Sequence, residues 1–387
     1  MPSTSLCPPS PFSRRTLLRW CGALPMATAL ALAPWAWAQS GPIRLVSHGD
    51  TSGANANQYK PWIAGAQAVF ERANKSGGIG GRPIELIVRN TGGKPKVAEE
   101  LTAKSLAEDK GTAFFGFGGG PVVKAVLPLI DQARMPLVAS FSGADELRGV
   151  TPYMFHIRPG FKVEVARIVR QMQSMGLKRV GVAAIDRPIG TGGVAQIEKL
   201  KAESGIEWVI VPFKEDRSDM DAAVASLLKP SPQAILVLAP SGPGVELIDR
   251  AKKAGYAGSW YGLSVLGASY AHEKLGDRAR GIVLTQTSPL PAAKTPFIRD
   301  DFSKLMAQAG IQSPQVEHVE GYIAARVMLE ALKRAGPKID SAAVVKAMES
   351  LRNFDLGGYT VDFGPDKRDG ASSIFLTMIA RDGKLVE

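Results

Sequence analysis

The sequence of 387 residues has only two cysteines, Cys7 and Cys21, both close to its amino terminus. The rest of the chain therefore has no disulfide framework and no cysteine-ligated metal site. Its four histidines lie far apart in the sequence and form no H-x-x-x-H pair, so no histidine motif for a metal is present either. We expect neither a metal nor another cofactor.

Long runs of one charge are also absent. The 47 Lys and Arg residues exceed the 36 Asp and Glu residues, giving a net charge of +11, but the basic residues are spread among acids. They are not interleaved with aromatic residues, so the sequence lacks the basic stripe that is typical of nucleic-acid-binding proteins. This charge supports at most a weak preference for anionic ligands or membrane headgroups.

No apolar run is long enough to span a bilayer, which needs about 20 residues. A shorter apolar stretch at 22–33 follows Arg14 and Arg15, and the small residues at 36–38 precede Gln39. This pattern predicts a signal peptide over residues 1–38, cleaved near Ala38, and a periplasmic location. The first 38 residues carry three arginines and no acid, so the net charge falls from +11 to +8 on cleavage.

Two export routes fit this signal peptide. Arg14 and Arg15 resemble the twin-arginine motif, which directs export of folded proteins. An ordinary secretory signal with two arginines fits equally well. Bulky Arg19 and Trp20 before Cys21 argue against a lipid-modified cysteine.

From Ile43 to Ala139, short apolar runs alternate with amphipathic stretches of helical length. Such alternation predicts β-α-β crossovers and a parallel sheet covered on both faces. The expected strands of this first lobe are 43–47, 84–89, 112–117 and 136–139, and the expected helices are 57–75, 97–108 and 121–133.

The same alternation starts again after Phe155 and predicts a second lobe of similar size. Its expected strands are 179–184, 208–212, 234–239 and 260–263, with helices at 162–175, 193–203, 220–228 and 244–254. Helices at 296–309, 319–334 and 341–351 and a strand-rich tail at 359–386 follow. The tail is too short to form a domain alone, so it must join one of the lobes. The predicted fold class is α/β, with two doubly wound parallel-sheet lobes.

No Pro-rich or Ser-rich linker separates the lobes, so we expect short crossings near His156, Thr285 and Leu356. The expected division is a signal peptide at 1–38, a first lobe at 39–156 plus 286–355, and a second lobe at 157–285 plus 356–387. Two rigid lobes joined by a three-segment hinge can close a cleft on a ligand.

The segment 74–86 reads Asn-Lys-Ser-Gly-Gly-Ile-Gly-Gly-Arg-Pro-Ile-Glu-Leu. It resembles a loop of the leucine/isoleucine/valine-binding family of periplasmic solute-binding proteins, the type I periplasmic binding proteins. Thr51-Ser52-Gly53 resembles the family's first strand-to-helix turn, and 107–116 and 135–149 match in order. The resemblance runs from about Ile43 to Val386, and it implies a receptor that serves an ABC importer.

The strongest candidate for a ligand-contacting loop is Phe117-Gly118-Gly119-Gly120-Pro121-Val122. Ligands of open parallel sheets bind where a strand ends and a helix begins, because unpaired N–H groups and the positive helix dipole lie there. The glycines let the backbone approach a ligand, and Pro121 suits the first helical position. A tight turn without a ligand is the alternative, but the position matches a ligand-contacting loop of the family.

Ser140-Phe141-Ser142-Gly143 follows the next strand and matches a second ligand-contacting turn of the family. Ser142 fits an N-cap equally well, because Asp145 three residues later completes a capping-box pattern. Ser140 has no such alternative role. Phe141 suits either stacking on a ligand or filling a gap in the core.

From the second lobe, the turn 186–190 and the strand ends near Ser241 and Ser264 are expected to face the same cleft. No residue is predicted to be catalytic. The complete set of candidate ligand-binding residues is Ser52, Tyr59, Phe117, Gly118, Gly119, Pro121, Val122, Ser140, Phe141, Ser142, Gly143, Asp186, Ile189, Ser241 and Ser264.

The sequence departs from the amino-acid receptors of the family at three positions. Ile189 replaces an aromatic residue, Gly143 replaces a threonine, and Leu263 or Ser264 stands where a carboxylate would hold the ligand ammonium. A buried ammonium without an acid costs several kcal/mol, which argues against an α-amino acid ligand.

Asp50 or Asp186 is placed to replace the missing acid. Without such a replacement, the departures favour an organic acid or another small anionic or amide-bearing metabolite. Backbone N–H groups, serines and Arg158 or Arg187 would hold it.

Enzyme motifs are weak. The segment 190–195 fits the pattern G-x-G-x-x-A, but it does not sit directly after the expected strand, where a dinucleotide-binding motif belongs. The glycine triplet 118–120 lacks the Lys and Ser/Thr of a phosphate-binding loop, and 262–266 lacks the spacing of a nucleophile elbow. We predict that the protein is not an enzyme.

Together these features predict an exported receptor that encloses a small solute between two lobes and presents the closed form to the permease of an ABC importer. We expect no nucleic-acid partner and a monomer. A ligand sensor for a membrane kinase would use the same closed surface, and a periplasmic Rossmann-type enzyme is a third hypothesis.

Overall fold

The computed structural model describes residues 41–53 and 55–387. The expected signal peptide lies outside the described residues, so its cleavage near Ala38 stays a prediction. Among the described helices, none is both long and apolar enough to cross a bilayer.

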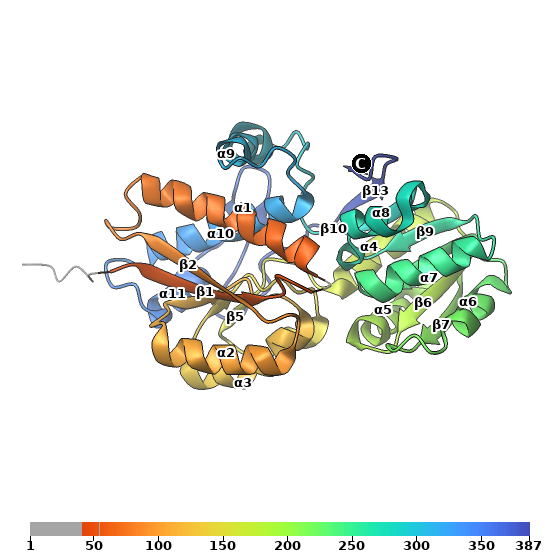
Figure 1. The fold of residues 1–387 in the computed structure, drawn as a ribbon, viewed down its shortest axis with the longest axis horizontal. Helices are drawn as coiled ribbons and strands as arrows, with labels where there is room; N and C mark the ends of the chain where they lie inside the picture. Colours follow the sequence, from red (N-terminus) through yellow and green to blue (C-terminus); the bar gives the residue numbers. More distant parts are fainter. Residues whose placement is uncertain (1–40, 54) are drawn as a thin grey trace, which may run out of the picture. The chain divides into compact units, whose positions relative to one another are not determined.

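The chain from residue 41 forms one parallel sheet and one mostly parallel sheet, each with helices on both faces, and a separate two-stranded antiparallel sheet (Figure 1). The first sheet has the order β2-β1-β3-β4-β5, and all its neighbouring strands are parallel. Its elements are β1 (Ile43–Gly49), α1 (Ala56–Lys75), β2 (Ile84–Asn90), α2 (Pro95–Glu108), β3 (Ala113–Phe115), α3 (Gly120–Ala133), β4 (Leu137–Val138) and β5 (Met154–Phe155).

Side chains of β1 enter two different cores, because successive residues of a strand point to opposite faces. Leu45 packs with α1 on one face, whereas Val46 packs with α3 on the other. Both residues are fully buried. Burial on both faces explains why this strand reads as a continuous apolar run.

The second sheet has the order β14-β13-β10-β9-β8-β6-β7, in which only β13 and β14 run antiparallel to their neighbours. Helices α4 and α5 cover one face, and α6, α7 and α8 cover the other. The elements up to the sheet's last parallel strand are α4 (Phe161–Ser174), β6 (Arg179–Ile185), α5 (Pro188–Ser204), β7 (Glu207–Phe213), α6 (Met220–Leu228), β8 (Ala234–Leu238), α7 (Ser241–Lys253), β9 (Ser259–Gly262), α8 (Ala268–Leu275) and β10 (Ile282–Gln286).

The last third of the chain contributes to both lobes. A π-helix at Ile298–Phe302 leads into α9, and α10 packs along α1 in the first lobe. Strands β13 and β14 extend the second sheet. The remaining elements are α9 (Ser303–Gln308), α10 (Val316–Arg334), α11 (Ser341–Glu349), β11 (Phe354–Asp355), β12 (Thr360–Val361), β13 (Phe375–Ile379) and β14 (Leu385–Val386).

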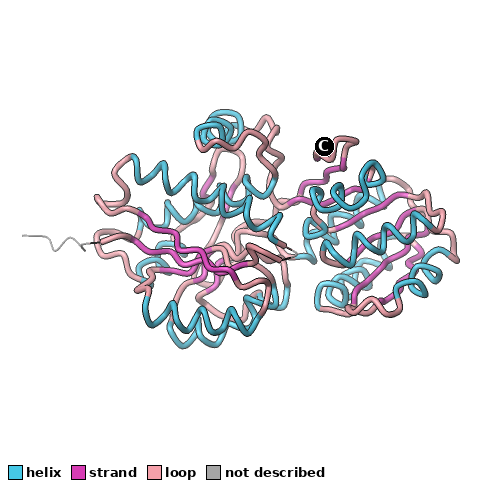
Figure 2. Tube along the Cα trace, in the orientation of Figure 1, coloured by secondary structure: helices cyan, strands magenta, loops and turns pink. Residues whose placement is uncertain are grey.

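The alternation of helices and strands that the sequence predicted is present in both lobes (Figure 2). Most expected elements end within two residues of their predicted bounds. Helix α5 differs, because it begins at Pro188 rather than Gly193. Strands β5 and β10 and helix α8 are not among the expected elements, and the expected helix 296–309 is divided between the π-helix and α9.

The chain passes between the sheets three times. It leaves the first sheet after Phe155 and leaves the second after Gln286. The third passage lies later than the expected boundary at Leu356, because Leu356, Tyr359 and Phe363 are buried in the core of the first lobe. The first and third passages are hydrogen-bonded side by side, from His156 to Arg368 and from Gly370 to His156, both at 2.8 Å.

Candidate functional site

A cavity of about 360 Å³ lies where strands of both sheets end. In the first lobe it is lined by the turns after β1, β3 and β4, and in the second lobe by the turns after β6, β8 and β9. The lining residues are Asp50, Asn55, Gln58, Tyr59, Gly118, Gly119, Gly120, Pro121, Lys124, Phe141, Ser142, Gly143, Ala144, Glu146, Arg158, Phe161, Arg187, Pro188, Ile189, Pro240 and Val265.

The glycine turn after β3 is tied to the neighbouring strands by backbone hydrogen bonds. Gly118 donates to His48 O at 2.9 Å, and Gly119 donates to Phe141 O at 3.2 Å. A Cβ on Gly118 would lie 2.9 Å from the Tyr59 ring, so glycine permits this close packing. Within the described chain, the N–H groups of Gly120 and Val122 have no backbone acceptor. They are the unpaired donors expected at the start of a helix.

The serine turn after β4 adds a hydroxyl and an aromatic ring to the cavity wall. Ser142 Oγ accepts a hydrogen bond from Ala144 N at 3.2 Å. The Phe141 ring lies 6.2 Å from the Tyr59 ring, and the Arg158 guanidinium carbon lies 5.0 Å from the Phe141 ring centroid. The turn therefore combines a polar group with a cation held over a ring.

Phe161, the first residue of α4, completes this wall from the second lobe. Its N–H donates to Gly143 O at 2.8 Å. A Cβ on Gly143 would lie 2.6 Å from the Phe161 ring, so the ring occupies the space that a side chain at position 143 would need. Gly143 thus permits an aromatic wall at this point.

Eight candidates from the sequence line the cavity: Tyr59, Gly118, Gly119, Pro121, Phe141, Ser142, Gly143 and Ile189. The other seven do not. Phe117 and Val122 are buried in the core between the first sheet and α3, because they neighbour the lining residues but point to the other side of the backbone. Ser140 is also buried, and its Oγ has no hydrogen-bond partner among the described residues.

The remaining four candidates have other neighbours. Ser52 and Asp186 are exposed, and Ser52 Oγ accepts a hydrogen bond from Asn90 at 2.8 Å. Ser241 Oγ donates to Val265 O at 2.9 Å. Ser264 belongs to the buried polar network described below.

Several lining residues had no signal in the sequence. Phe161 begins α4, Pro240 precedes α7 and Val265 lies in the turn after β9, and each faces residues that are distant in the sequence. Gln58 lies in the first turn of α1 and is buried, and no motif marks it in the sequence. That these residues line the cavity becomes visible only in the three-dimensional structure, where the ends of both sheets come together.

Asp50 lines the cavity, but its carboxylate is already bonded to the backbone. Oδ1 accepts hydrogen bonds from the N–H groups of Ser52 and Gly53, and Oδ2 accepts one from Asn55 at 3.0 Å. Asp50 is only 4% exposed. Its charge is therefore engaged in holding the turn before α1 rather than directed at a ligand.

Arg158 lies in the first crossing between the sheets and is only 7% exposed. Its Nη1 donates to Glu320 Oε2 on α10 at 2.7 Å, and its Nη2 donates to Ser264 Oγ after β9. Glu320 also accepts a hydrogen bond from Thr287 at 3.1 Å, in the second crossing. One guanidinium thus connects the two lobes directly beneath the cavity.

Glu164 on α4 closes this buried polar network. Ser264 donates to it through N at 2.8 Å and through Oγ at 3.0 Å, and Thr285 donates through its hydroxyl. Burial raises the pKa of Glu164, although the nearby Arg158 opposes the shift. Burial also raises the pKa of Glu317 to about 7, against a backbone hydrogen bond that lowers it.

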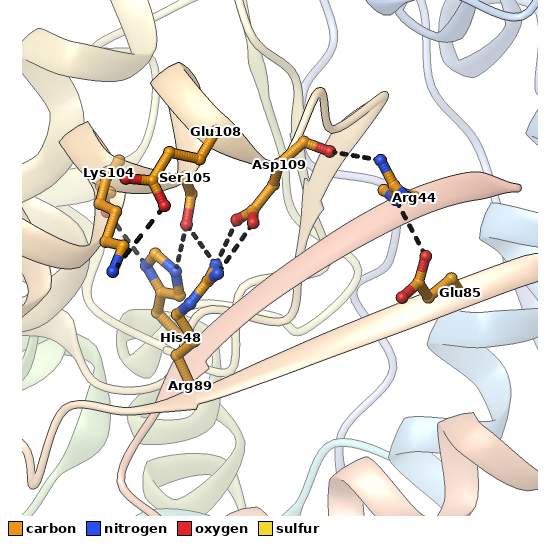
Figure 3. Close-up of polar contacts among 9 residues, drawn as sticks. Arg44, His48, Glu85, Arg89, Lys104, Ser105, Glu108 and Asp109 are labelled. Atoms are coloured by element: carbon orange, nitrogen blue, oxygen red, sulfur yellow. Dashed lines mark hydrogen bonds and ion pairs between the residues drawn. The ribbon is translucent and has the colours of Figure 1, made fainter.

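A second polar cluster lies between β1, β2 and α2 (Figure 3). His48 contacts Thr102 Oγ1 through Nδ1 at 3.1 Å and Ser105 Oγ through Nε2 at 3.2 Å. Arg89 donates to Ser105 at 2.7 Å and forms a bidentate ion pair with Asp109. Burial lowers the pKa of His48 to about 4, and the charge of Arg89 adds to the shift.

This cluster resembles a catalytic arrangement only in composition. Asp109 pairs with Arg89 rather than with His48, so no carboxylate orients the imidazole. His48 also stacks on the core residue Phe117, with ring centroids 4.5 Å apart. Within the described residues, no group of His, Cys, Asp and Glu is arranged to hold a metal.

A family model described as periplasmic binding protein matches residues 42–384. The chain belongs to the periplasmic binding protein family. The two-lobed α/β fold predicted from the sequence is therefore confirmed, and so is the predicted likeness to the type I members. The proteins it resembles are substrate-binding receptors and not enzymes.

Solved structures support the same assignment. An extracellular ligand-binding receptor from Verminephrobacter eiseniae is 28% identical, with a TM-score of 0.82 and coverage of 90% of this chain and 100% of that chain. A substrate-binding periplasmic protein from Ralstonia solanacearum is 28% identical, with a TM-score of 0.80 and coverage of 89% and 99%. No match was found among curated protein sequences.

A branched-chain amino acid ABC transporter structure from Thermus thermophilus, solved with bound valine, shares the fold at 18% identity. Its TM-score is 0.77, and the alignment covers 89% of this chain and 95% of that chain. At this identity the likeness shows the fold alone.

Proposed function

We propose that the protein is an exported receptor that encloses a small anionic metabolite between its two lobes and delivers it to an ABC importer. The observation that carries the proposal is the cavity of about 360 Å³, which turns from the ends of both sheets line together. This volume lies at the small end of the range for ligand pockets. The proposal includes removal of residues 1–38 and function in the periplasm.

The first lobe supplies the groups that would hold a carboxylate. Helix α3 begins at Gly120 in the cavity wall, and the N–H of Gly120 has no backbone acceptor in the described chain. The positive end of the helix dipole favours an anion there. Ser142 Oγ, which accepts from Ala144, keeps its own proton to donate.

Closure around the solute would use the three crossings. A solute that contacts both lobes binds the closed state more tightly than the open state. Binding therefore shifts the equilibrium between the open and closed states toward the closed state. The importer permease would bind the closed surface. Few large hydrophobic side chains are exposed among the described residues, which supports a receptor that acts as a monomer.

The test is a thermal-shift screen of residues 39–387 against metabolite libraries, followed by calorimetry. A ligand at 100 times its Kd stabilises the folded state by about 2.7 kcal/mol, which a melting curve resolves. Val265→Trp, which fills the cavity, should abolish the shift, whereas Met175→Trp at an exposed site outside the cavity should keep it. A shift that survives Val265→Trp would contradict the site.

Delivery is tested separately in cells. Deletion of the gene should abolish uptake of the labelled solute, and a plasmid copy should restore it. Normal uptake in the deletion strain would contradict the role in import while leaving the binding result unaffected.

A further inference from the structure

We infer that the solute is an aryl monocarboxylate without an α-ammonium group, of the size of phenylacetate or 3-phenylpropanoate. The inference rests on the proposed receptor function and names its substrate class. Three observations support it: the described lining offers no buried, unpaired carboxylate to an ammonium, a helix start with unpaired N–H groups lies in the cavity wall, and aromatic rings from both lobes line the cavity.

Among the described lining residues, an α-ammonium group would find no acid that is both buried and free of other hydrogen bonds. Among the described lining residues the only acids are Asp50 and Glu146, both from the first lobe. Asp50 is bonded to three backbone N–H groups, and Glu146 is exposed to solvent. A desolvated ammonium without a carboxylate is strongly unfavourable, so amino acids are disfavoured.

At the end of β9, the described residues of the second lobe also present no carboxylate to the cavity. Leu263 is fully buried in the core, and Ser264 is bonded to Glu164. Glu164 does not line the cavity, and its hydrogen bonds with Ser264 and Thr285 hold it behind the wall. Among the described lining residues from the β6, β8 and β9 turns, the only charged one is Arg187, whose guanidinium forms an ion pair with Glu215 at 3.0 Å.

The start of α3, rather than the lining cations, is the feature of the cavity that suits an anion. Lys124, Arg158 and Arg187 line the cavity, but Arg158 pairs with Glu320, and Arg187 pairs with Glu215 at 3.0 Å. The charge of Arg158 is balanced by Glu320, so the carboxylate of the solute would bind the N–H groups at the start of α3 with Lys124 nearby. A single carboxylate is what one helix start can hold together with the exposed Lys124, which has no ion-pair partner among the described residues.

The apolar part of the solute would lie between flat side chains. Phe141 from the first lobe and Phe161 from the second lobe both line the cavity, and the ring of Tyr59 lies 6.2 Å from that of Phe141. Pro188 and Pro240 add flat aliphatic surface. Aromatic rings favour offset or edge contacts with another ring, so these walls suit an aryl group better than a branched alkyl group.

The test compares Kd values by calorimetry for matched acids on residues 39–387. The series is benzoate, phenylacetate and 3-phenylpropanoate, and the controls for the last are L-phenylalanine, 3-phenylpropan-1-ol and 3-cyclohexylpropanoate. Compared with 3-phenylpropanoate, L-phenylalanine adds the ammonium, 3-phenylpropan-1-ol lacks the carboxylate, and 3-cyclohexylpropanoate lacks the aromatic ring. We expect at least one aryl acid to bind, and the 3-phenylpropanoate controls to bind at least tenfold more weakly than their parent.

A variant tests the missing acid directly. Ile189→Asp places a carboxylate in the second-lobe wall, and Ala195→Asp places the same charge on an exposed, non-lining position of the same helix. Ile189→Asp should weaken aryl acid binding at least tenfold and shift the ratio of the two affinities, for the aryl acid and for L-phenylalanine, in favour of L-phenylalanine. Ala195→Asp should change neither the affinity nor the ratio.

The outcomes separate the two proposals. Tighter binding of L-valine, L-leucine or L-phenylalanine than of every aryl acid would overturn this inference and leave the receptor function standing. Equal binding of 3-cyclohexylpropanoate would overturn its aromatic part. If no member of a broad metabolite library binds, the receptor function itself is wrong.

Discussion

At the residue scale, His48 shows how burial fixes the charge of a side chain. Its ring contacts two hydroxyls and one aromatic face, so the neutral imidazole is well accommodated while the cation is not. Burial therefore lowers its pKa from 6.5 to about 4. Between these two values the unfolded chain binds a proton at residue 48 that the folded chain does not.

We predict that stability contributed by His48 is lost as the pH falls from 6.5 to 4. By pH 5 the loss should reach about 2 kcal/mol, since each unit of pKa shift corresponds to about 1.4 kcal/mol. Glu317 acts in the opposite direction, because its raised pKa removes stability as the pH rises from 4.5 through 7.

The variant His48→Gln separates the two effects. Gln can bond both hydroxyls but does not titrate, so urea unfolding between pH 7.5 and 5 should show a smaller loss of stability than in the wild type. His272→Gln, at a histidine outside this cluster, serves as the control. An unchanged pH slope in His48→Gln would mean that His48 does not titrate as described.

The sequence predicted which turns line the cavity better than it predicted which side chains do. The glycine turn at 118–120 was found because tight turns and helix starts have a local signature. Phe117 and Val122 were placed in the site because they adjoin that turn, yet they point into the core. Phe161 was missed, because its contact with Gly143 depends on how the second lobe meets the first.

At the element scale, α1 and α10 pack closely because each has a glycine at the crossing. A Cβ on Gly321 would lie 1.9 Å from Trp62 O, and a Cβ on Gly65 would lie 2.2 Å from His318 O. Both helices contribute buried residues to the larger core cluster of the first lobe. Their separation is therefore set by backbone-to-backbone contact.

We predict that Gly321→Ala destabilises the protein by about 1–3 kcal/mol, the usual cost of overpacking a core. The matched control is Gly192→Ala in α5, where a Cβ has nothing within 4 Å. That change should stabilise the protein by about 0.5–1 kcal/mol through helix propensity. Equal effects of both variants on urea midpoints would contradict the close packing.

Helices and strands with a clear pattern of apolar residues were predicted well, whereas very short strands were not. Strand β1 and helix α6 follow from their apolar patterns alone. Strand β5 has two residues and β10 continues directly into a crossing, so neither has a boundary that local sequence marks. Their position is fixed by pairing with distant strands.

At the scale of the whole molecule, Arg158 connects the lobes through Glu320 on one side and Ser264 on the other. A buried carboxylate that loses its partner is costly, whereas removing both charges together is much less so. The network also adjoins the cavity, so it joins the crossings to the site.

We predict that Arg158→Met costs about 3–5 kcal/mol in the free energy of unfolding. Combining it with Glu320→Gln should recover a large part of that loss, because the unpaired carboxylate is then absent. The control is Arg179→Met, whose partner Glu207 is exposed, with an expected cost below about 1 kcal/mol. A double variant no more stable than Arg158→Met would show that the two charges are not coupled.

The most direct test of the two-lobed receptor is the distance between spin labels on the lobes. Residues 39–387 contain no cysteine, so Glu100→Cys and Lys199→Cys, both at exposed helical positions, can be labelled cleanly. Saturation with the solute that gives the largest thermal shift should shorten the mean distance between the labels by several ångströms. An unchanged distance, in a sample that calorimetry shows to be saturated, would contradict closure of the lobes on the solute.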